Sequence, residues 1–258
     1  MLGKRLIIAG LMASAGALSV PSVMPLFAED AQTIEQAISS AERPDTDRAR
    51  DADRKPSEVL SFFGVEEGQT ILDLFSGGGY YTELLSRIVG PNGKVTAHNN
   101  AAYLSFAKND LKTRYENGRL ANVQSLIAEA DDIHLAPDSL DFVMMTLTFH
   151  DLYYHSENWP EIDADRLLSE LFKGLKPGGV VGIIDHSAKT GAPLELTANQ
   201  LHRIDAGKVI TIMTGHGFVL VDESDVLRNP DDPLTISMFD ASIRGKTDRF
   251  VMKFKKPE

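Results

Sequence analysis

The sequence predicts an α/β fold in which helices cover both faces of a parallel sheet. Short, nearly continuous apolar runs alternate with longer amphipathic segments along most of the chain, and such runs are typical of strands buried on both faces. One run passes directly into a glycine-rich turn at 76–79 that opens a helical segment. The length of 258 residues suits one large domain. These observations together favour βαβ units over an all-helical or all-β protein.

The expected elements follow one another in a regular order up to residue 184. Ser57 is expected to cap a first helix that is stopped by Gly64. Buried strands are expected at Thr70–Phe75, Lys94–His98, Val123–Ala128, Leu140–Thr146 and Val180–Ile184. Helices are expected between them at Tyr81–Val89, Ala101–Tyr115 and Ile162–Leu175, and the last is closed by Lys176-Pro177-Gly178-Gly179.

The last third of the chain has a different pattern. Strands are expected at Phe218–Glu223 and Phe250–Lys255, and the long polar connection between them has no strong helical pattern. Two strands without a helical crossover predict an antiparallel pair at the edge of the sheet. The folded domain is therefore expected to cover residues 55–258. The charge-rich residues 29–54 are expected to form an N-terminal arm with helical pieces.

Residues 1–28 have the pattern of a secretory signal peptide. Lys4 and Arg5 precede an apolar run from Leu6 to Val20, and a positive start before an apolar core of about fifteen residues is typical of such peptides. We expect cleavage after Ala28 and a periplasmic or secreted mature protein. The alternative is a retained membrane anchor, although the run is short beside the ~20 apolar residues that span a bilayer.

Composition excludes several classes of function. The formal net charge of −11 argues against a nucleic-acid binder or a protein held on an anionic membrane, since both need a basic face. The chain has no cysteine, which excludes a disulfide framework, a thiolate zinc site, an iron–sulfur cluster and a cysteine nucleophile. A chain without thiols also suits an oxidising compartment.

The glycine turn is the most informative segment. Glycines such as Gly77 and Gly79 let the backbone approach a ligand and adopt positive φ, and the following helix start offers unpaired N–H groups. No Lys-Ser/Thr pair follows the glycines, so this is not a nucleoside-triphosphate loop. Asp73 at the end of the preceding strand would repel a phosphate, and it favours a cationic ligand.

These residues resemble the first motif of the class I S-adenosylmethionine-dependent methyltransferases, acid-x-Gly-x-Gly-x-Gly. Asp73, Gly77 and Gly79 match it, and Phe75 stands in the place of its first glycine. Asn99 occupies the place of the family's acid that holds the ribose hydroxyls. A hydrogen bond to a charged acceptor is worth about 1.5–3 kcal/mol against about 1 kcal/mol for a neutral one. The resemblance therefore predicts that Asn99 weakens cofactor binding by about tenfold without abolishing it.

Later segments match the same family in the same order. Glu129, Ala130 and Asp131 lie in a segment that resembles the family's adenine-binding Gly-Asp-Ala-x-x-Leu-Pro, with Glu129 the best match for its acid and Asp131 the second choice. Phe149-His150-Asp151-Leu152 takes the place of the family's Leu-His-His-Leu, and Leu175-Lys-Pro-Gly-Gly179 matches its turn before the fifth strand.

The resemblance covers residues 55–255 and implies a fold and a cofactor. It implies a Rossmann-like sheet of seven strands in the order 3-2-1-4-5-7-6, with the last strand antiparallel, helices on both faces and S-adenosylmethionine as cofactor. A group of exported, predicted methyltransferases shares the Gly-Gly-Gly-Tyr-Tyr sequence and the late segment from Ile243 to Phe250. The alternative fold is a nicotinamide-binding Rossmann domain.

Catalytic candidates follow the fourth and fifth predicted strands, because ligands of open α/β sheets bind at the carboxyl ends of strands. These candidates are His150, Asp151, His155, Asp185 and His186. We expect His150, Asp151 and His186 to act in catalysis, since such groups can take a proton or orient an acceptor. An alternative is a divalent metal held by His150, Asp151, His155 and His186. Their spacing matches no zinc signature, so we predict no metal.

Other candidates have an ordinary structural explanation beside a functional one. Tyr80 and Tyr81 either pack over the methionine part of the cofactor or belong to the core. Trp159, the only tryptophan, lies near the expected pocket or packs under Pro160. The helix before Gly217 presents a possible pocket roof or a solvated face, formed by His202, Arg203 and Asp205. A possible internal ion-pair cluster precedes the last strand and consists of Arg244, Lys246, Asp248 and Arg249.

The sequence thus predicts an exported S-adenosylmethionine-dependent methyltransferase that acts on a small-molecule acceptor, with no nucleic-acid partner and no membrane partner after signal removal. The alternative is an extracytoplasmic ligand- or metal-binding protein on a methyltransferase scaffold that has lost catalysis. Methyl transfer is an in-line displacement, so positioning of the acceptor beside the methyl group accounts for much of the catalysis.

Overall fold

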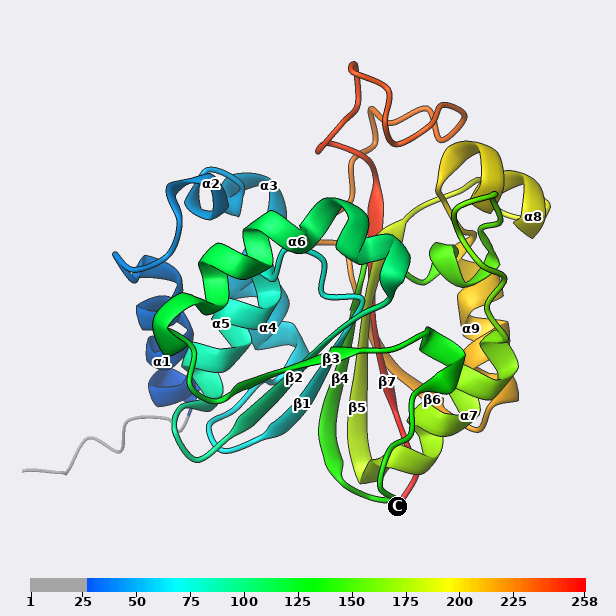
Figure 1. The fold of residues 1–258 in the computed structure, drawn as a ribbon. Helices are drawn as coiled ribbons and strands as arrows, with labels where there is room; N and C mark the ends of the chain where they lie inside the picture. Colours follow the sequence, from blue (N-terminus) through cyan, green and yellow to red (C-terminus); the bar gives the residue numbers. More distant parts are fainter. Residues whose placement is uncertain (1–26) are drawn as a thin grey trace, which may run out of the picture.

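The apolar runs of the sequence form the strands of one sheet in the computed structural model, which describes residues 27–258, with side chains from Thr33 onward (Figure 1). The strands are β1 (Thr70–Leu74), β2 (Lys94–Asn99), β3 (Val123–Ile127), β4 (Leu140–Thr146), β5 (Leu175–His186), β6 (Val219–Ser224) and β7 (Arg249–Lys255). Their order in the sheet is β3-β2-β1-β4-β5-β7-β6, which confirms the predicted order.

The pairing directions also agree with the prediction. β1 runs parallel to β2 and β4, and β5 runs parallel to β4. β7 is antiparallel to both β5 and β6. The chain order reverses between β1 and β4, so the carboxyl ends of these two neighbours flank the switch point at which ligands bind in open sheets.

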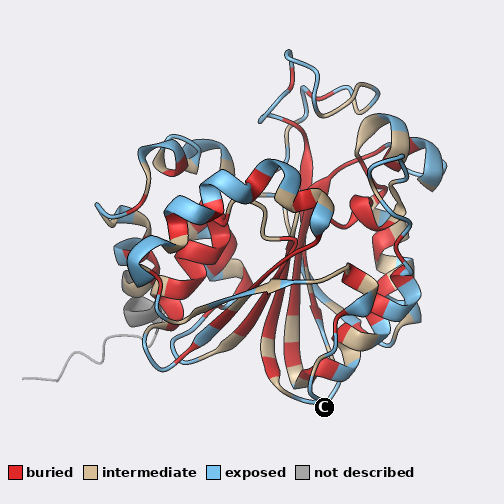
Figure 2. Ribbon diagram, in the orientation of Figure 1, coloured by how far each residue is buried: buried red, intermediate tan, exposed pale blue. Residues whose placement is uncertain are grey.

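Helices cover both faces of the sheet. They are α1 (Phe27–Ser39), α2 (Asp45–Arg48), α3 (Asp51–Arg54), α4 (Pro56–Phe63), α5 (Tyr80–Val89), α6 (Ala101–Tyr115), α7 (Ala164–Gly174), α8 (Leu194–Leu196) and α9 (Ala206–Gly215), with short helical turns η1 (Glu116–Gly118), η2 (Ala130–Asp132), η3 (His150–Tyr153) and the π-helical η4 (Thr197–Leu201). One core cluster packs α1, α4 and α5 on the sheet, and a second packs α7 and α9 on the other face. The central strands between the two layers are buried (Figure 2).

Successive side chains of β1 alternate between the two faces of the sheet and so contribute to both helical layers. Ile71 belongs to the core under α4 and α5, whereas Leu72 and Leu74 belong to the core under α7. Successive side chains of a strand point to opposite faces. Asp73 therefore points to the same face as Ile71, where Thr82 of α5 contacts it.

Two boundaries differ from the prediction by more than two residues, and Ser57 is no cap, because α4 already begins at Pro56. β5 begins at Leu175, five residues before the expected strand at Val180–Ile184, because Leu175 already pairs with Leu140 before a bulge. Helix α9 starts at Ala206, after the three residues expected to lie on it: His202 and Arg203 precede the helix, and Asp205 is its N-cap. The carboxylate of Asp205 accepts the backbone N–H of Gly207 at 2.9 Å, and this bond sets the start of the helix.

The N-terminal arm packs against the domain. Arg43 binds Asp51 at 2.7 Å, and the same carboxylate accepts the hydroxyl of Tyr80 at 2.6 Å. The guanidinium of Arg54 lies 4.5 Å from the centre of the Tyr80 ring. Within the described residues, no helix is long and apolar enough to cross a membrane. The predicted signal peptide, 1–28, lies outside the described residues except for the first two backbone positions of α1.

Candidate active site

A cavity of about 520 Å³ opens at the switch point between β1 and β4. Its walls come from the glycine turn after β1, the first turns of α6, the segment after β4 and the loop around Phe239. A larger and more open hollow of about 890 Å³ lies beside the amino ends of β2 and β3. We place the site in the smaller cavity, because ligands of open α/β sheets bind at the carboxyl ends of strands.

The glycine turn is held open by the side chain of Asn99. Its Oδ1 accepts the N–H of Gly77 at 2.9 Å, and its Nδ2 donates to the hydroxyl of Ser76 at 2.9 Å. Gly77 has φ +56°, and an added Cβ there would meet no atom within 4 Å. The turn thus leaves open space beside the Cα of Gly77, while the backbone N–H and C=O of this residue are both bonded to Asn99. Asn99 lies behind the turn and is not among the residues that border the cavity.

Phe75 takes the place of a glycine although its backbone is in the left-handed region, with φ +52°. The ring stacks on Tyr103 at 5.0 Å between centroids and meets the edge of His98 at 5.1 Å. Burial lowers the pKa of His98 to about 4, although its bond to the carbonyl of Ala128 opposes this. A neutral imidazole therefore packs against the phenyl ring, and aromatic packing compensates for the backbone strain of Phe75.

Asp73 borders the cavity from beneath the turn. Its Oδ2 accepts the hydroxyl of Thr82 at 2.6 Å. Burial raises the pKa of Asp73 to about 7, although the Thr82 hydroxyl and the charge of Arg114 favour the ionised form. An ionised carboxylate at this wall attracts a positively charged ligand group.

The expected adenine-binding residues lie apart from this cavity. Glu129 accepts the N–H of Ala101, the first residue of α6, at 3.4 Å. Ala130 is buried, and Asp131 accepts the N–H of Asp163 at 3.3 Å. None of the three borders the 520 Å³ cavity, so their part in cofactor binding stays a prediction.

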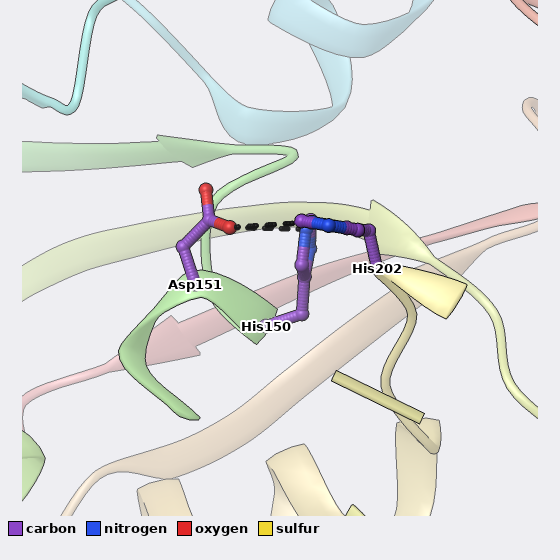
Figure 3. Close-up of side chains that lie close together, drawn as sticks. All are labelled: His150, Asp151 and His202. Carbon is purple, nitrogen blue, oxygen red and sulfur yellow. Dashed lines mark ion pairs between the residues drawn. The ribbon is translucent and has the colours of Figure 1, made fainter. Parts of the chain in front are cut away.

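A polar cluster formed by His150, Asp151 and His202 adjoins the cavity (Figure 3). Nε2 of His150 lies 3.3 Å from Oδ1 of Asp151, and Nδ1 of His202 lies 3.9 Å from the same oxygen. The other oxygen of Asp151 accepts the hydroxyl of Tyr103 at 2.7 Å. Asp151, His202 and Tyr103 border the cavity, whereas His150 is fully buried behind them.

Asp185 holds His150 from the side away from the cavity. Its Oδ1 bonds Nδ1 of His150 at 2.7 Å, and its Oδ2 accepts the backbone N–H of the same residue at 2.8 Å. Burial lowers the pKa of His150, but the charges of Asp185 and Asp151 outweigh burial and raise it to about 9. The imidazole therefore prefers the cationic form when the two carboxylates are its only charged partners.

His186 and His155 do not join this cluster. Nδ1 of His186 bonds the hydroxyl of Thr247 at 2.6 Å, and its ring lies 5.9 Å from that of His150. Burial and the nearby charge of His150 hold the pKa of His186 well below its usual value. His155 is exposed, and its N–H donates to Asn199. The four residues expected as a metal set therefore do not converge, and His202 takes the place of the other two histidines.

Two further expectations are wrong. Arg203 lies on no solvated helix face, because it is fully buried and pairs with Asp232 at 2.9 Å. The four residues before the last strand form no ion-pair cluster among themselves in the described structure. Asp248 pairs with Arg228, Arg249 donates to the carbonyl of Asp53, and Arg244 lies over the ring of Phe239.

Several residues of the site were not singled out in the sequence. They are Arg50, Arg54, Tyr103, Phe106, Asp110, Thr146, Leu147, Thr148, Met238 and Phe239. Two of them could have been predicted to lie at the site, because they follow the carboxyl ends of strands. Tyr103 lies in the first turn of the helix after β2, and Thr148 follows β4. Tyr80, Tyr81 and Trp159 also border the cavity.

The cavity wall fits a ligand with several polar groups. Three buried polar atoms on its lining residues have no hydrogen-bond partner among the described residues: Oγ1 of Thr146, Oγ1 of Thr148 and Nε1 of Trp159. Buried polar groups are normally satisfied. The carboxylate of Asp73 suits the cationic groups of S-adenosylmethionine, and these three donors suit its hydroxyls and its carboxylate.

Comparison with known proteins agrees with this geometry. Residues 53–219 match the sequence profile of the ubiE/COQ5 methyltransferase family. The chain is 27% identical over 194 residues to the ubiquinone/menaquinone biosynthesis C-methyltransferase UbiE of Idiomarina loihiensis, which covers 72% of this chain and 70% of that protein. The protein of the same name from Vibrio parahaemolyticus is 31% identical over 132 residues, 51% of this chain and 46% of that protein. Apart from the first, the chain thus spans about half the length of the relatives it matches.

Solved structures share the fold. A methyltransferase from Aquifex aeolicus described as SAM dependent superposes with a TM-score of 0.57 at 23% identity, over 88% of this chain and 98% of that chain. The phosphoethanolamine N-methyltransferase 2 of Haemonchus contortus, in complex with S-adenosyl-L-methionine, superposes with a TM-score of 0.55 at 16% identity, over 87% of this chain and 60% of that chain. The chain therefore belongs to the ubiE/COQ5 methyltransferase family and is an S-adenosylmethionine-dependent methyltransferase.

Proposed function

We propose that this chain methylates a small, flat organic acceptor that binds in the 520 Å³ cavity. The observation that carries the proposal is the arrangement of that cavity: Asp73 and the glycine turn form one wall, and Asp151 and His202 form another. A donor and an acceptor bound to these two walls would lie side by side in one enclosure, which is the positioning that methyl transfer requires.

The lining supports an aromatic acceptor. Phe106, Trp159 and Phe239 surround the cavity together with Tyr103, and such side chains pack well on flat rings. The relatives are named ubiquinone/menaquinone biosynthesis C-methyltransferases, which supports a ring carbon as the atom that receives the methyl group.

The cofactor, when bound, supplies a methyl group on a positively charged sulfur. We assign Asp73 to the attraction of that positive charge and the backbone of Gly77 to close contact with the cofactor. The unpaired hydroxyls of Thr146 and Thr148 then bind its polar groups. The resemblance still assigns Phe75, Gly79, Asn99, Glu129, Ala130 and Asp131 to the cofactor as well.

The three catalytic candidates differ in how close they lie to the cavity in which the acceptor binds. Asp151 borders the cavity and is held by Tyr103, so its carboxylate is placed to bind and orient the acceptor. His150 touches Asp151 but not the cavity, and it acts as a positioning residue. His186 lies further away against Thr247, and we expect its replacement to affect catalysis less than that of Asp151.

Calorimetric titration of S-adenosylmethionine into the purified chain tests the proposal. We expect micromolar binding, about −8 kcal/mol, and its loss in Asp73→Ala. Label transfer from methyl-labelled cofactor to a panel of phenols and quinols then tests for turnover. No heat up to millimolar cofactor would contradict the proposal, whereas binding without any turnover would favour the alternative of a binding protein on this scaffold.

We also propose that the protein is exported, as the signal-peptide pattern of residues 1–28 indicates. Fractionation of the native host followed by mass spectrometry of the N-terminus tests this. We expect a mature chain that begins at Glu29 outside the cytoplasm. A full-length chain in the cytoplasm, or one that keeps residues 1–28 in the membrane, would overturn export without affecting the methyltransferase proposal.

A further inference from the structure

We propose that His150, Asp151 and His202 form a binding site for a divalent transition-metal ion on the acceptor side of the cavity. One ligand atom from each of the three residues lies within 4.8 Å of the others. The side chains converge from two separate segments, η3 and the end of η4 (Figure 3). This inference concerns a different ligand from the proposed cofactor, and it can be tested without any methyl transfer.

His150 presents its free nitrogen to the cluster. Asp185 accepts the backbone N–H groups of His150 and His186, so its carboxylate is an acceptor and Nδ1 of His150 must donate to it. In the neutral ring this leaves Nε2 with a lone pair. Nε2 is buried and has no hydrogen-bond partner among the described residues, because its approach to Asp151 lies outside hydrogen-bond geometry. Metal-binding histidines commonly have this support, with the second ring nitrogen on a carboxylate.

Asp151 offers one oxygen to the same point. Tyr103 occupies Oδ2 through its hydroxyl, which leaves Oδ1 directed at the two histidines. Bonds of about 2.0–2.2 Å from a metal to nitrogen and oxygen place neighbouring ligands about 3.4 Å apart in a tetrahedral site. The distance of 3.3 Å from His150 matches this spacing, and the distance of 3.9 Å from His202 needs a closer approach of about half an ångström.

His202 is held in place by an unusual backbone and by aromatic rings. It has φ +51° and ends the π-helical turn η4, and both features concentrate at functional sites. Its ring lies 4.5 Å from the centre of Tyr154 and 4.8 Å from that of Phe239. The imidazole is therefore fixed before a ligand arrives, which lowers the entropy cost of binding.

The charge of the cluster favours a cation. With both imidazoles neutral, as metal binding requires, Asp151 and Asp185 supply two negative charges, and no lysine or arginine in the described part of the chain forms an ion pair with either. The buried Arg203 is already paired with Asp232. Two nitrogens and one oxygen suit Zn²⁺, Fe²⁺ or Mn²⁺ rather than Mg²⁺ or Ca²⁺, which prefer oxygen ligands.

The site would keep open positions toward the cavity. Three protein ligands leave at least one position of a metal free, and Asp151 and His202 both border the cavity. The free position would take an oxygen of the bound small molecule, such as a phenolate. The structure thus points to a metal as a further contact for an oxygen-bearing acceptor.

Zn²⁺ titration of the full chain, prepared without a histidine tag and stripped with a chelator, tests the inference. We expect one Zn²⁺ per chain by calorimetry and a visible absorption band with Co²⁺ that Zn²⁺ removes but Mg²⁺ does not. Second-shell partners alone change metal affinity by about 10–100-fold, so loss of a ligand in His202→Ala should weaken binding by at least about 100-fold.

His155→Ala is the matched control, because this exposed histidine lies outside the cluster, and it should bind Zn²⁺ as the wild type does. Asp151→Asn provides a second ligand variant of the same shape if His202→Ala is poorly folded. Equal Zn²⁺ affinity in the wild type, His202→Ala and Asp151→Asn would overturn the proposed site. So would the absence of a stoichiometric site in the wild type.

Discussion

Asp73 is a carboxylic acid whose charge changes near neutral pH. It is buried at the end of β1, and burial raises its pKa to about 7 against the opposing effects of Thr82 and Arg114. A carboxyl group with this pKa is mostly protonated at pH 6 and mostly ionised at pH 8. The wall of the cavity beneath the glycine turn is therefore more negative on the alkaline side of neutrality.

We expect the affinity for S-adenosylmethionine to rise by about tenfold between pH 6 and pH 8, because only the ionised form of Asp73 attracts a cation. Asp73→Asn should bind weakly at every pH and lack this rise. Calorimetry at several pH values checks the prediction, and the ratio of wild-type to variant affinity cancels the titration of the ligand itself. Parallel pH profiles for the two proteins would contradict it.

The sequence predicts the position of a site residue when that residue directly follows a strand. It does not predict the position when the residue reaches the site through contacts between distant segments. Asp73 and Asp151 could be placed at the sheet edge because the strands before them are evident. His202 was expected on a helix, yet it reaches the cluster through a left-handed residue after a π-helical turn. Sequence periodicity contains no signal for such a turn. The hydrogen bond from Gly77 to Asn99 likewise joins the glycine turn to the end of β2, two segments that are separate in the sequence.

At the scale of elements, the glycine turn and the helix that follows it allow a matched test. Gly77 and Gly64 both have positive φ, +56° and +74°, and an added Cβ would meet no atom within 4 Å at either position. Gly64 ends α4, and it does not border the cavity. The two glycines thus share a backbone constraint and differ in their distance from the site.

Replacement by alanine should destabilise the protein by a similar amount at both positions, about 1 kcal/mol, because alanine is strained in the left-handed region. Only Gly77→Ala should lose cofactor affinity, since its new methyl group occupies space that the bound cofactor needs. Denaturant unfolding gives the stabilities and calorimetry the affinities. Equal cofactor affinity in the two variants would contradict the assigned role of the turn.

Element boundaries were predictable where one local signal dominates. The strands at the centre of the sheet were found almost to the residue because their apolar runs are continuous. The early start of β5 was not found, because Lys176-Pro177-Gly178-Gly179 reads locally as a turn. The segment becomes part of β5 because Leu175 pairs with Leu140. This contact joins residues far apart in the sequence, so no local pattern predicts it.

For the whole molecule, the order of the sheet was predictable from family resemblance, whereas the attachment of the arm was not. The arm is joined to the domain by buried ion pairs between residues far apart in the chain. Arg114 of α6 lies 2.8 Å from Asp47 of the arm and 2.5 Å from Glu83 of α5. Arg119 also binds Glu83, at 2.5 Å. The positions of charged residues in a single sequence do not reveal which distant residues they pair with.

Glu83 is the centre of this network, and its replacement tests how strongly the buried charges stabilise the fold. The carboxylate is fully buried and binds Arg87, Arg114 and Arg119. Glu83→Gln should lower the free energy of unfolding by about 3 kcal/mol, because it leaves buried guanidinium groups without their charge partner. Glu42→Gln is the control: its exposed carboxylate pairs with Arg87 at 3.1 Å, and its loss should cost less than about 1 kcal/mol.

The pH dependence of the Glu83→Gln defect separates lost charge from lost packing. Burial raises the pKa of Glu83, but its bonds to Arg119 and Arg87 outweigh burial and hold the pKa below its usual value of 4.5. A lowered pKa in the folded state contributes stability above pH 4.5, and this contribution disappears as the pH falls through the folded value. The difference in unfolding free energy between wild type and Glu83→Gln should therefore shrink below pH 4.5 in denaturant titrations. A difference that stays constant into acid would show that the glutamate acts by shape alone and that its charge adds nothing to the stability of the fold.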